Sequence, residues 1–511
     1  MLSKLFSAAI FGTEAFVVDV EVDVHSGLPS FNIVGLPDTA VQESRERVRA
    51  AIKNSEFEFP MQRITVNLAP ADTKKEGPIF DLSIALAILT ACKQVKPELL
   101  DEYLILGELS LDGSIKPVSG VLPIALMAKK IGKNKLLLPK ANAKEAGIIK
   151  ELKVFPVNSL CEVVEFLNKK ISIEPISVDL EDIFKQNMNN QVDFTDIKGQ
   201  EHAKRAFEVA AAGSHNVIMI GPPGSGKTML ARRLPTILPS LTLEESIEIT
   251  KLYSIAGLLP PETPLVTERP FRAPHHTISN VGLIGGGRMP KPGEISLAHN
   301  GVLFLDELPE FSRGALESLR QPLEDGIITI SRSLSSVNYT SSFMLIASLN
   351  PCPCGFYGDP VKVCTCSSSQ IVKYRSKISG PLLDRIDIHI EVPRVNCREV
   401  MEKDNLEDSF AIRERVEKAR KTQRERYCED SIFSNAQMTK KQTKKYCNLS
   451  DKAKNLLYKA MEKLNLSARA YDRILKVTRT IADLEPSVEI EIAHLSEAIQ
   501  YRSLDRKLWL Y

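Results

Sequence analysis

Residues 215–228 read HNVIMIGPPGSGKT, and this stretch decides which fold to expect. The segment HNVIMI reads as a short apolar strand, and it runs directly into the pattern GxxxxGKT of a phosphate-binding loop. Glycines in such a loop let backbone N–H groups curl around a di- or triphosphate, and the following helix presents its positive end to the anion. A helical pattern, MLARRL at 229–234, does follow. A chance glycine-rich turn would not need this context, so the sequence predicts a nucleotide site.

The predicted nucleotide contacts are the eight residues of this loop and the helix start. They are Gly221, Pro222, Pro223, Gly224, Ser225, Gly226, Lys227 and Thr228. Lys227 is expected to reach the β- and γ-phosphates, and the Thr228 hydroxyl is expected to bind Mg²⁺. ATP and Mg²⁺ are therefore the predicted cofactors.

The chain has 511 residues, enough for about three domains, and the composition of an ordinary globular protein. Its net charge is +2, so a nucleic-acid surface would have to be a local patch. The longest apolar run, Leu82–Cys92, is too short to span a bilayer, so no membrane partner is expected. Nine cysteines, an odd number, indicate a reduced compartment. The start, MLSKLFSAAIFGTEAF, reads as a first strand or turn rather than a signal peptide, so a cytoplasmic protein is predicted.

The pattern along the chain predicts three domains and one linker. Residues 1–168 open with alternating, strand-like segments, and residues 169–193 are polar, acidic and irregular, which suits a linker. Residues 194–395 alternate apolar strands with helices, which predicts an α/β domain. Residues 396–511 are mostly helical and charged.

Two adjacent carboxylates follow a second apolar strand, GVLFLDE at 301–307. A buried strand would deliver Asp306 to the water shell of Mg²⁺, and Glu307 could then orient and deprotonate the attacking water. The alternative is a strand end with two solvated acids. Because the pair follows a phosphate-binding loop, the hydrolytic interpretation is favoured.

A third apolar strand, FMLIASL at 343–349, ends in Asn350. A polar amide at a strand tip beside the γ-phosphate would position the attacking water, the role called sensor 1. Alone, an Asn before Pro351 is a turn former. As the third polar strand end in this order, Asn350 is predicted to be part of the active site.

The order of these motifs, followed by SGPLLDRID at 379–387, resembles the AAA+ ATPases of the magnesium-chelatase and MCM-like clade. Three longer motifs resemble the YifB/ComM family of bacterial magnesium-chelatase-like ATPases: RPFRAPHHTIS (269–279), PGEISLAHNGV (292–302) and NPCPCG (350–355). The resemblance extends over nearly the whole chain. It implies an α/β P-loop AAA+ core, an α+β N-terminal domain similar to ribosomal protein S5 and the Lon protease, and a helical C-terminal lid.

The same resemblance implies that the ATPase works as a ring, a homo-hexamer. Arg385 matches the arginine finger, which reaches a neighbouring subunit's nucleotide. The alternative is that Arg385 only forms a surface salt bridge with Asp384 or Asp387. In SARAYDRIL (467–475), Arg469 aligns best with the sensor-2 arginine, and Arg473, four residues on, is the near alternative.

Two close cysteine pairs suggest a structural Zn²⁺ site, since four thiolates in one loop can close a tetrahedron. They are Cys352 and Cys354, followed by Cys364 and Cys366. The C-x-C spacing is tighter than the usual C-x₂-C, and the alternative is a reduced loop whose thiols do nothing. The paired His275 and His276 are expected in a loop or helix edge near the ring pore, not in a metal site.

The segment TKKEGPIFDLSIAL (73–86) resembles the nucleophile region of Lon-type proteases, and GSIKPVSGVL (113–122) resembles their later Gly-x-x-Lys region. Ile79 stands where a Lon domain has its serine, so peptide hydrolysis by that mechanism is excluded. Lys116 is interpreted as a surface lysine. The domain is expected to be a scaffold, or a contact for DNA or a partner.

A DNA translocase is the favoured function, because resemblance to the ComM branch implies helicase or branch-migration activity in recombination during natural transformation. Arg332 and its neighbours at 331–340 would form a pore hairpin that contacts phosphates. A basic helical stretch adds support, although such runs are usually solvated faces: Lys418, Arg420, Lys421, Arg424 and Arg426. The alternatives are a protein-remodelling motor resembling the magnesium chelatase motor subunit, and a non-catalytic nucleotide switch, which Glu307 and Arg385 argue against.

Overall fold

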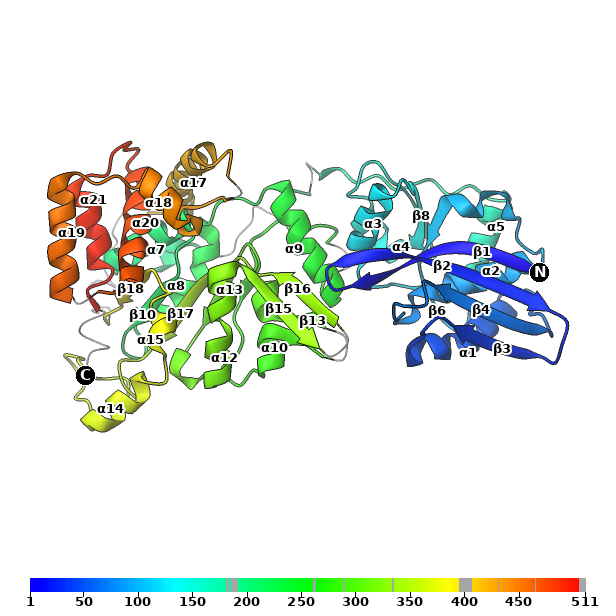
Figure 1. Cartoon of the computed structure of the whole chain (residues 1–511), viewed down its shortest axis with the longest axis horizontal. Helices are drawn as coiled ribbons and strands as arrows, with labels where there is room; N and C mark the ends of the chain where they lie inside the picture. Colours follow the sequence, from blue (N-terminus) through cyan, green and yellow to red (C-terminus); the bar gives the residue numbers. More distant parts are fainter. Residues whose placement is uncertain are drawn as a thin grey trace. The chain divides into compact units, whose positions relative to one another are not determined.

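The computed structural model describes residues 1–180, 183–184, 192–260, 263–287, 290–332, 335–394, 407–430, 432–464 and 466–504 (Figure 1). The chain divides into two compact units. The first unit comprises Met1–Asn187, Ser246–Thr267 and Ser333–Val337, and the second comprises Met188–Glu245, Glu268–Arg332 and Asn338–Tyr511. Two segments from within the predicted α/β stretch therefore belong to the N-terminal unit.

The first unit is built on a seven-stranded sheet with the strand order β3-β4-β2-β1-β5-β8-β9. Its strands are β1 (Leu2–Phe11), β2 (Glu14–His25), β3 (Ser30–Val34), β4 (Arg63–Ala69), β5 (Tyr103–Ile105), β8 (Lys135–Pro139) and β9 (Lys153–Val157). The β1–β2 and β2–β4 pairs are antiparallel and the other pairs are parallel. The strand expected at the start of the chain is confirmed as β1.

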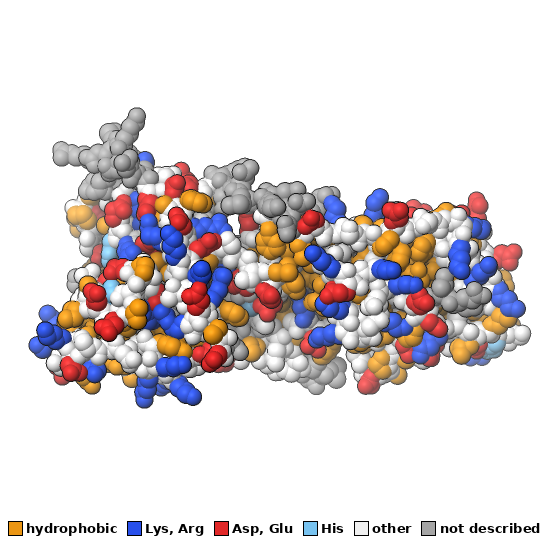
Figure 2. All heavy atoms as spheres, turned by 90° about the horizontal axis from the view of Figure 1, so that it is seen from above, with side chains coloured by type: hydrophobic (Ala, Val, Ile, Leu, Met, Phe, Trp, Pro, Cys, Tyr) orange, Lys and Arg blue, Asp and Glu red, His pale blue; other side chains and the backbone are white. Residues whose placement is uncertain are grey.

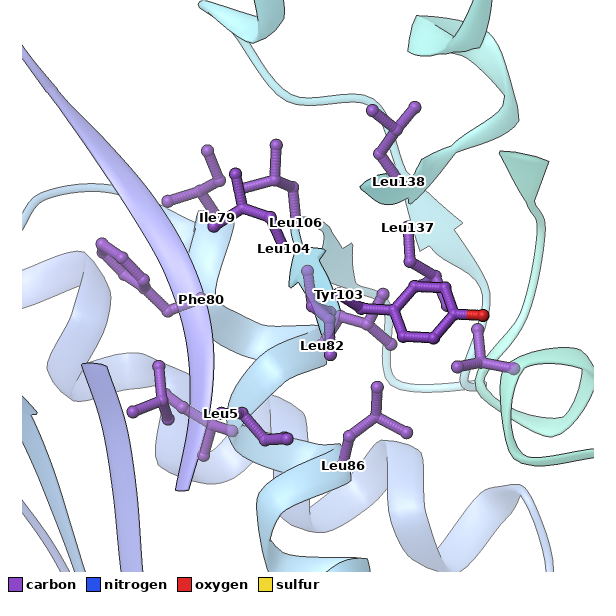
Figure 3. Close-up of a cluster of buried hydrophobic side chains, with 14 of the residues drawn as sticks. Leu5, Ile79, Phe80, Leu82, Leu86, Tyr103, Leu104, Leu106, Leu137 and Leu138 are labelled. Atoms are coloured by element: carbon purple, nitrogen blue, oxygen red, sulfur yellow. The ribbon is translucent and has the colours of Figure 1, made fainter. Parts of the chain in front are cut away.

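Helices complete this unit: α1 (Thr39–Asn54), α2 (Asp81–Ala91), α3 (Val121–Lys130), α4 (Lys140–Ala146), α5 (Leu160–Leu167) and, from residue 246 on, α9 (Leu243–Ala256). Helix α2 is buried along nearly its whole length, and its leucines pack with Leu5 and Tyr103 in one apolar core (Figure 3). The one charge in α2, Asp81, is fully buried and accepts a 2.7 Å hydrogen bond from Arg47 Nε. A buried carboxylate needs such a partner, so this pair fixes α1 against α2.

Ile79 and Lys116, the two residues at the positions related to Lon proteases, lie in different environments. Ile79 is buried in the apolar core beside Leu106 (Figure 3), whereas Lys116 is exposed on the short strand β7 (Ile115–Lys116), which pairs with β6 (Glu108–Leu109). An aliphatic side chain offers no nucleophile for peptide hydrolysis. Lys116 is therefore a surface lysine, as the sequence suggested.

The second unit contains a five-stranded parallel sheet with the order β11-β14-β17-β10-β18. Its strands are β11 (Phe271–Arg272), β14 (Val302–Leu305), β17 (Met344–Leu349), β10 (Val217–Ile220) and β18 (Ile388–Glu391). All side chains of β10, β14 and β17 are buried, as expected when both faces of a parallel sheet are covered. The predicted α/β P-loop core is confirmed.

Two hairpins pair short strands outside this sheet. One pairs β15 (Ile327–Arg332) with β16 (Ser335–Thr340), and the other pairs β12 (Gly285–Gly286) with β13 (Lys291–Pro292). Along β16, Val337 and Tyr339 are buried while Asn338 and Thr340 are exposed. Tyr339 donates a 2.5 Å hydrogen bond to the Pro290 carbonyl, so it joins the hairpins and is not available for a ligand.

The C-terminal part of the second unit is helical, which confirms that prediction. Its main helices are α17 (Ser409–Arg426), α18 (Lys440–Tyr446), α19 (Asp451–Leu464), α20 (Ala468–Leu484) and α21 (Ile492–Gln500). They pack together with α7 (Glu201–Gly213) around a shared core. Within the described ranges, no helix is both long enough and apolar enough to cross a membrane.

Candidate active site

The phosphate-binding loop joins the carboxyl end of β10 to the start of α8 (Lys227–Arg233). Gly224 and Gly226 adopt left-handed backbone conformations (φ 77° and 88°), which direct the N–H groups of the loop inward. Gly221 packs so closely that a Cβ there would lie 2.1 Å from the Val392 carbonyl oxygen. The loop lines a cavity of about 440 Å³ together with Asp306 and Asn350. Backbone donors, a cation and a carboxylate at one cavity fit a magnesium-bound nucleoside triphosphate.

Lys227 is the cation of this cavity, and only 8% of its surface is exposed. Its Nζ donates to the carbonyls of Gly221 (2.7 Å) and Pro222 (2.9 Å) and lies 3.3 Å from Asn350 Oδ1. Burial lowers the pKa of the Lys227 amine to about 8, although the charges of Asp306 and Glu307 oppose this shift. A desolvated ammonium with neutral hydrogen-bond partners is well suited to bind phosphate oxygens.

Asp306 and Thr228 meet as predicted for a magnesium site. Thr228 Oγ1 donates to Asp306 Oδ2 at 2.8 Å, and the Glu307 N–H donates to Asp306 Oδ1 at 3.1 Å. Ser348 donates to the same Oδ1 from the neighbouring strand β17. Ser348 was not predicted from the sequence, although its position two residues before Asn350 places both side chains on the same face of that strand.

Glu307 follows β14 with a left-handed backbone (φ 54°), and 54% of its side chain is exposed. This conformation turns the carboxylate toward the cavity that it lines with Asn350. His276, from the turn after β11, lies with Nδ1 3.8 Å from Glu307 Oε2 and packs its ring edge-on to Phe311. His275 and His276 lie in a loop, as expected. The contact between His276 and Glu307 was not predicted from the sequence.

The arginines predicted to act on nucleotide lie at the other end of the sheet. Asn216 stands at the amino end of β10, and its Nδ2 donates to the Arg385 carbonyl at 3.2 Å. Its backbone N–H donates to Asp387, which also receives a 2.9 Å hydrogen bond from Arg473 Nη1. The four residues of β10, at about 3.3 Å each, separate this end of the strand from the phosphate-binding loop by roughly 13 Å. One chain therefore does not bring Arg385 or Arg473 to its own cavity.

Arg385 is 4% exposed, and its guanidinium pairs with Glu324 on α13 (Arg320–Asp325) at 2.5 Å. The salt-bridge partner is thus neither Asp384 nor Asp387. The Arg385 hydrogen bond, followed by the charges of Arg385, Arg469 and Arg473, lowers the pKa of the Glu324 carboxyl. Arg469 itself is exposed. Three arginines therefore gather around one carboxylate on this side of the sheet.

The four predicted metal ligands are brought together in one loop. The sulfurs of Cys352, Cys354, Cys364 and Cys366 all lie within 4.8 Å of one another. A hydrogen bond from the Phe356 N–H lowers the pKa of the Cys354 thiol to about 6. Such a cluster can hold a metal ion.

The predicted basic stretch on α17 is only partly at the surface. Arg420 is buried and donates to the Phe433 carbonyl at 3.0 Å, and the half-buried Arg426 pairs with buried Asp483. Arg420 lies on the face of α17 that packs against α7 and α20, so it serves the fold. Lys421 and Arg424 remain exposed.

Comparisons with known proteins agree with this geometry. Residues 193–400 match the family "Magnesium chelatase, subunit ChlI", residues 20–142 match "Subunit ChlI of Mg-chelatase", and residues 406–502 match its C-terminal family. The "Competence protein ComM" of Haemophilus influenzae is 45% identical over 512 residues, covering 99% of this chain and 98% of that protein. The "Uncharacterized protein YifB" of Escherichia coli is 42% identical over 510 residues, with the same coverage of both chains. The "Magnesium-chelatase 67 kDa subunit" of Heliobacterium mobile is 29% identical over 197 residues, which cover 33% of this chain and 29% of that subunit.

Proposed function

The chain belongs to the ComM and YifB family of magnesium chelatase-like AAA+ ATPases, and from this we propose that it is an ATP-driven ring motor that moves DNA strands. One observation supports the ring: the cavity around the phosphate-binding loop and the proposed finger Arg385 lie at opposite ends of the parallel sheet. A complete site then needs two copies of the chain. AAA+ ATPases commonly oligomerise, and a homo-hexamer is the assembly we propose.

Within one chain, five side chains of the cavity would each have one task in hydrolysis. Bound Mg·ATP supplies a γ-phosphoryl group that can be transferred to water. Lys227 would hold the β- and γ-phosphate oxygens, and Thr228 and Asp306 would hold the metal and its water shell. Glu307 would accept the proton of the attacking water, and Asn350 would orient that water.

The residue from the second chain is Arg385. A guanidinium that reaches the neighbouring cavity would stabilise the negative charge that develops on the transferred group. To do so, Arg385 must exchange Glu324 for phosphate oxygens, an exchange that a planar fork of donors suits well. Arg469 is our first choice for a further trans-acting arginine because it is exposed, while Arg473 is already paired with buried Asp387.

DNA is the proposed track, single-stranded or branched. The exposed face of the β15–β16 hairpin carries Asn338 and Thr340, which can donate to phosphate oxygens without reading bases. Basic and acidic side chains are interspersed over the face shown in Figure 2, so contact would be local rather than through a broad positive field. Similarity to a protein named for competence supports helicase or branch-migration work in natural transformation, in the cytoplasm where DNA and ATP are both present.

A second candidate is a motor that remodels protein partners, as the magnesium chelatase motor subunit would. The chelatase 67 kDa subunit matches only a third of this chain, whereas ComM matches 99% of it. The full-length similarity therefore favours the DNA motor.

The two candidates differ in how ATP hydrolysis responds to DNA. We expect single-stranded and branched DNA to stimulate the ATPase of the full chain several-fold, and the stimulation to weaken as salt rises, because phosphate contacts release counterions. ATP turnover that ignores both kinds of DNA at low salt would reject the DNA motor. The Glu307→Gln variant, purified in the same way, measures the background from contaminating ATPases.

A further inference from the structure

We propose that the loop between β17 and α14 (Ser368–Arg375) holds one structural zinc ion through its four cysteines, and that this metal site braces the phosphate-binding loop. The inference rests on the proposed nucleotide site, and it does not depend on DNA as the track. The ligands are Cys352, Cys354, Cys364 and Cys366.

The spacing of the sulfurs is that of a metal tetrahedron. Cys352 Sγ lies 3.3 Å from Cys354 Sγ and 3.7 Å from Cys364 Sγ, and the last two sulfurs are 3.6 Å apart. A zinc ion bound at about 2.3 Å by four thiolates sets its ligands about 3.8 Å apart, the edge of a tetrahedron. A disulfide would require about 2.0 Å. Two of these three distances lie within about 0.2 Å of that edge, and the Cys366 sulfur lies within 4.8 Å of the other three. The spacing therefore fits separate thiolates around one ion.

Backbone donors support the sulfurs from within the loop. The Cys354 N–H donates to Cys366 Sγ, and the Cys366 N–H donates to Cys364 Sγ, both at 3.4 Å. Such bonds stabilise negative charge on sulfur and hold ligands in orientation, as outer-shell contacts do in metal sites. Closed sets of four thiolates select zinc or iron, and a structural site without an open position suits zinc.

The loop has little else to fold around. Residues 351–367 contain neither helix nor strand, and three of the loop's apolar side chains are exposed: Tyr357 (41%), Val361 (70%) and Val363 (88%). Phe356 is half-buried. The buried centre of the loop is instead Cys352, which is fully covered. A segment without an apolar core needs another source of stability, and a metal supplies it in small domains.

The same loop touches the nucleotide cavity at two points. Gly355 (φ 84°) packs against Pro223 of the phosphate-binding loop so closely that a Cβ there would lie 2.5 Å from Pro223 Cδ. The loop also begins directly after Asn350, and Arg375 fixes this start by donating to the Pro351 carbonyl at 3.1 and 3.0 Å. A metal that holds the four sulfurs in place would therefore also hold Gly355 against Pro223 and fix the backbone next to Asn350.

Metal analysis of the purified full chain tests the site. We expect about one zinc per chain in the wild type, and a Co²⁺-substituted protein with the absorption of a tetrahedral thiolate site. Cys364→Ser should lose most of the metal, while Cys428→Ser, at an exposed cysteine outside the cluster, should keep it. A wild type that carries no zinc, or carries iron instead, would overturn the assignment, as would equal zinc content in both variants.

Two glycine variants test the brace without touching the ligands. Gly355 and Gly358 share a left-handed backbone (φ 84° and 81°), so alanine strains both alike, but a Cβ at Gly358 would meet no described atom within 4 Å. We expect both variants to keep zinc, and Gly355→Ala alone to weaken binding of a fluorescent Mg·ATP analogue by about tenfold, or 1.4 kcal/mol. Equal affinities for the two variants would overturn the brace. Neither zinc content nor nucleotide affinity involves DNA. These measurements can therefore support or reject the metal site whether or not the protein proves to be a DNA motor.

Discussion

The side-chain amide of Asn216 donates to the carbonyl of Arg385 at 3.2 Å, at the amino end of the strand whose carboxyl end leads into the phosphate-binding loop. This hydrogen bond ties the proposed arginine finger to the far side of the sheet from Lys227. A single chain thus contributes a cavity at one end and an arginine at the other, as a subunit of a head-to-tail ring must.

Mixing two inactive variants should restore activity. Arg385→Ala keeps an intact cavity and Lys227→Ala keeps an intact finger, and each alone is expected to lose at least about 100-fold in ATP turnover. In rings assembled from an equal mixture after denaturation or co-expression, about a quarter of the sites pair an intact cavity with an intact finger. Steady-state ATPase should recover accordingly. The matched control mixes Lys227→Ala with Glu307→Gln, whose defects are both in the cavity. Recovery there too, or none in the first mixture, would rule out a finger that acts in trans.

Glu307→Gln should separate binding from hydrolysis. The amide keeps the size of the side chain but cannot accept the proton of water, so turnover should fall by about 10²–10⁴-fold with little change in ATP affinity. Glu310→Gln is the control, since Glu310 is an exposed acid that pairs with Lys377 outside the cavity. If the two variants hydrolyse ATP equally well, Glu307 is not the base.

Lys227 should make ATP affinity depend on pH. Burial lowers the pKa of its amine to about 8 in the free protein, and bound phosphates would raise that pKa because they favour the charged form. Affinity is therefore complete below pH 8 and declines above it, by up to about tenfold per pH unit. Calorimetric titration of Mg·ATP from about pH 7 to 9.5 measures the slope. Lys227→Arg stays charged over this range, so its affinity should be flat. A flat wild-type profile would show that the amine is already fully charged throughout.

Arg473 and Arg469 should differ in what they stabilise. Although burial acts to raise it, the charge of Arg473 and the hydrogen bond from the Asn216 N–H hold the pKa of the Asp387 carboxyl well below its usual range. Arg473→Ala leaves that buried carboxylate without its cation, which should cost about 3–5 kcal/mol of stability. Exposed Arg469→Ala should cost less than about 0.5 kcal/mol but lower ATP turnover. Urea unfolding and ATPase assays on both variants decide the matter, and a stable, inactive Arg473→Ala would reverse the assignment.

Two kinds of site residue could be predicted from the sequence: those that are contiguous in the chain, and those that lie at the ends of neighbouring parallel strands. The strand, loop and helix around Lys227 are contiguous, and Asp306 and Asn350 meet there because the carboxyl ends of parallel strands share one edge. Ser348, His276 and Glu324 were missed, because each gains its partner only through tertiary packing across at least 31 residues of sequence.

Two surface interpretations failed for a related reason. Arg420 is part of a basic run in the sequence. It nevertheless lies on the packed face of α17 with Val416 and Gln423, because residues four and seven apart share one face of a helix, and counting charges does not take this spacing into account. Tyr339 likewise alternates with exposed Asn338 and Thr340, so its side chain points into the fold. The packing of residues 246–267 into the N-terminal unit left no mark in the local pattern, because α9 has an ordinary helical sequence.

Strand exchange on a synthetic three- or four-way DNA junction with labelled arms would show directly whether this ATPase moves DNA strands. We expect the wild-type chain to resolve the junction into its products only when ATP and Mg²⁺ are present, while Glu307→Gln binds the junction and leaves it intact. Wild-type protein that hydrolyses ATP at full rate but leaves every junction intact would contradict the claim that this ATPase is a DNA motor.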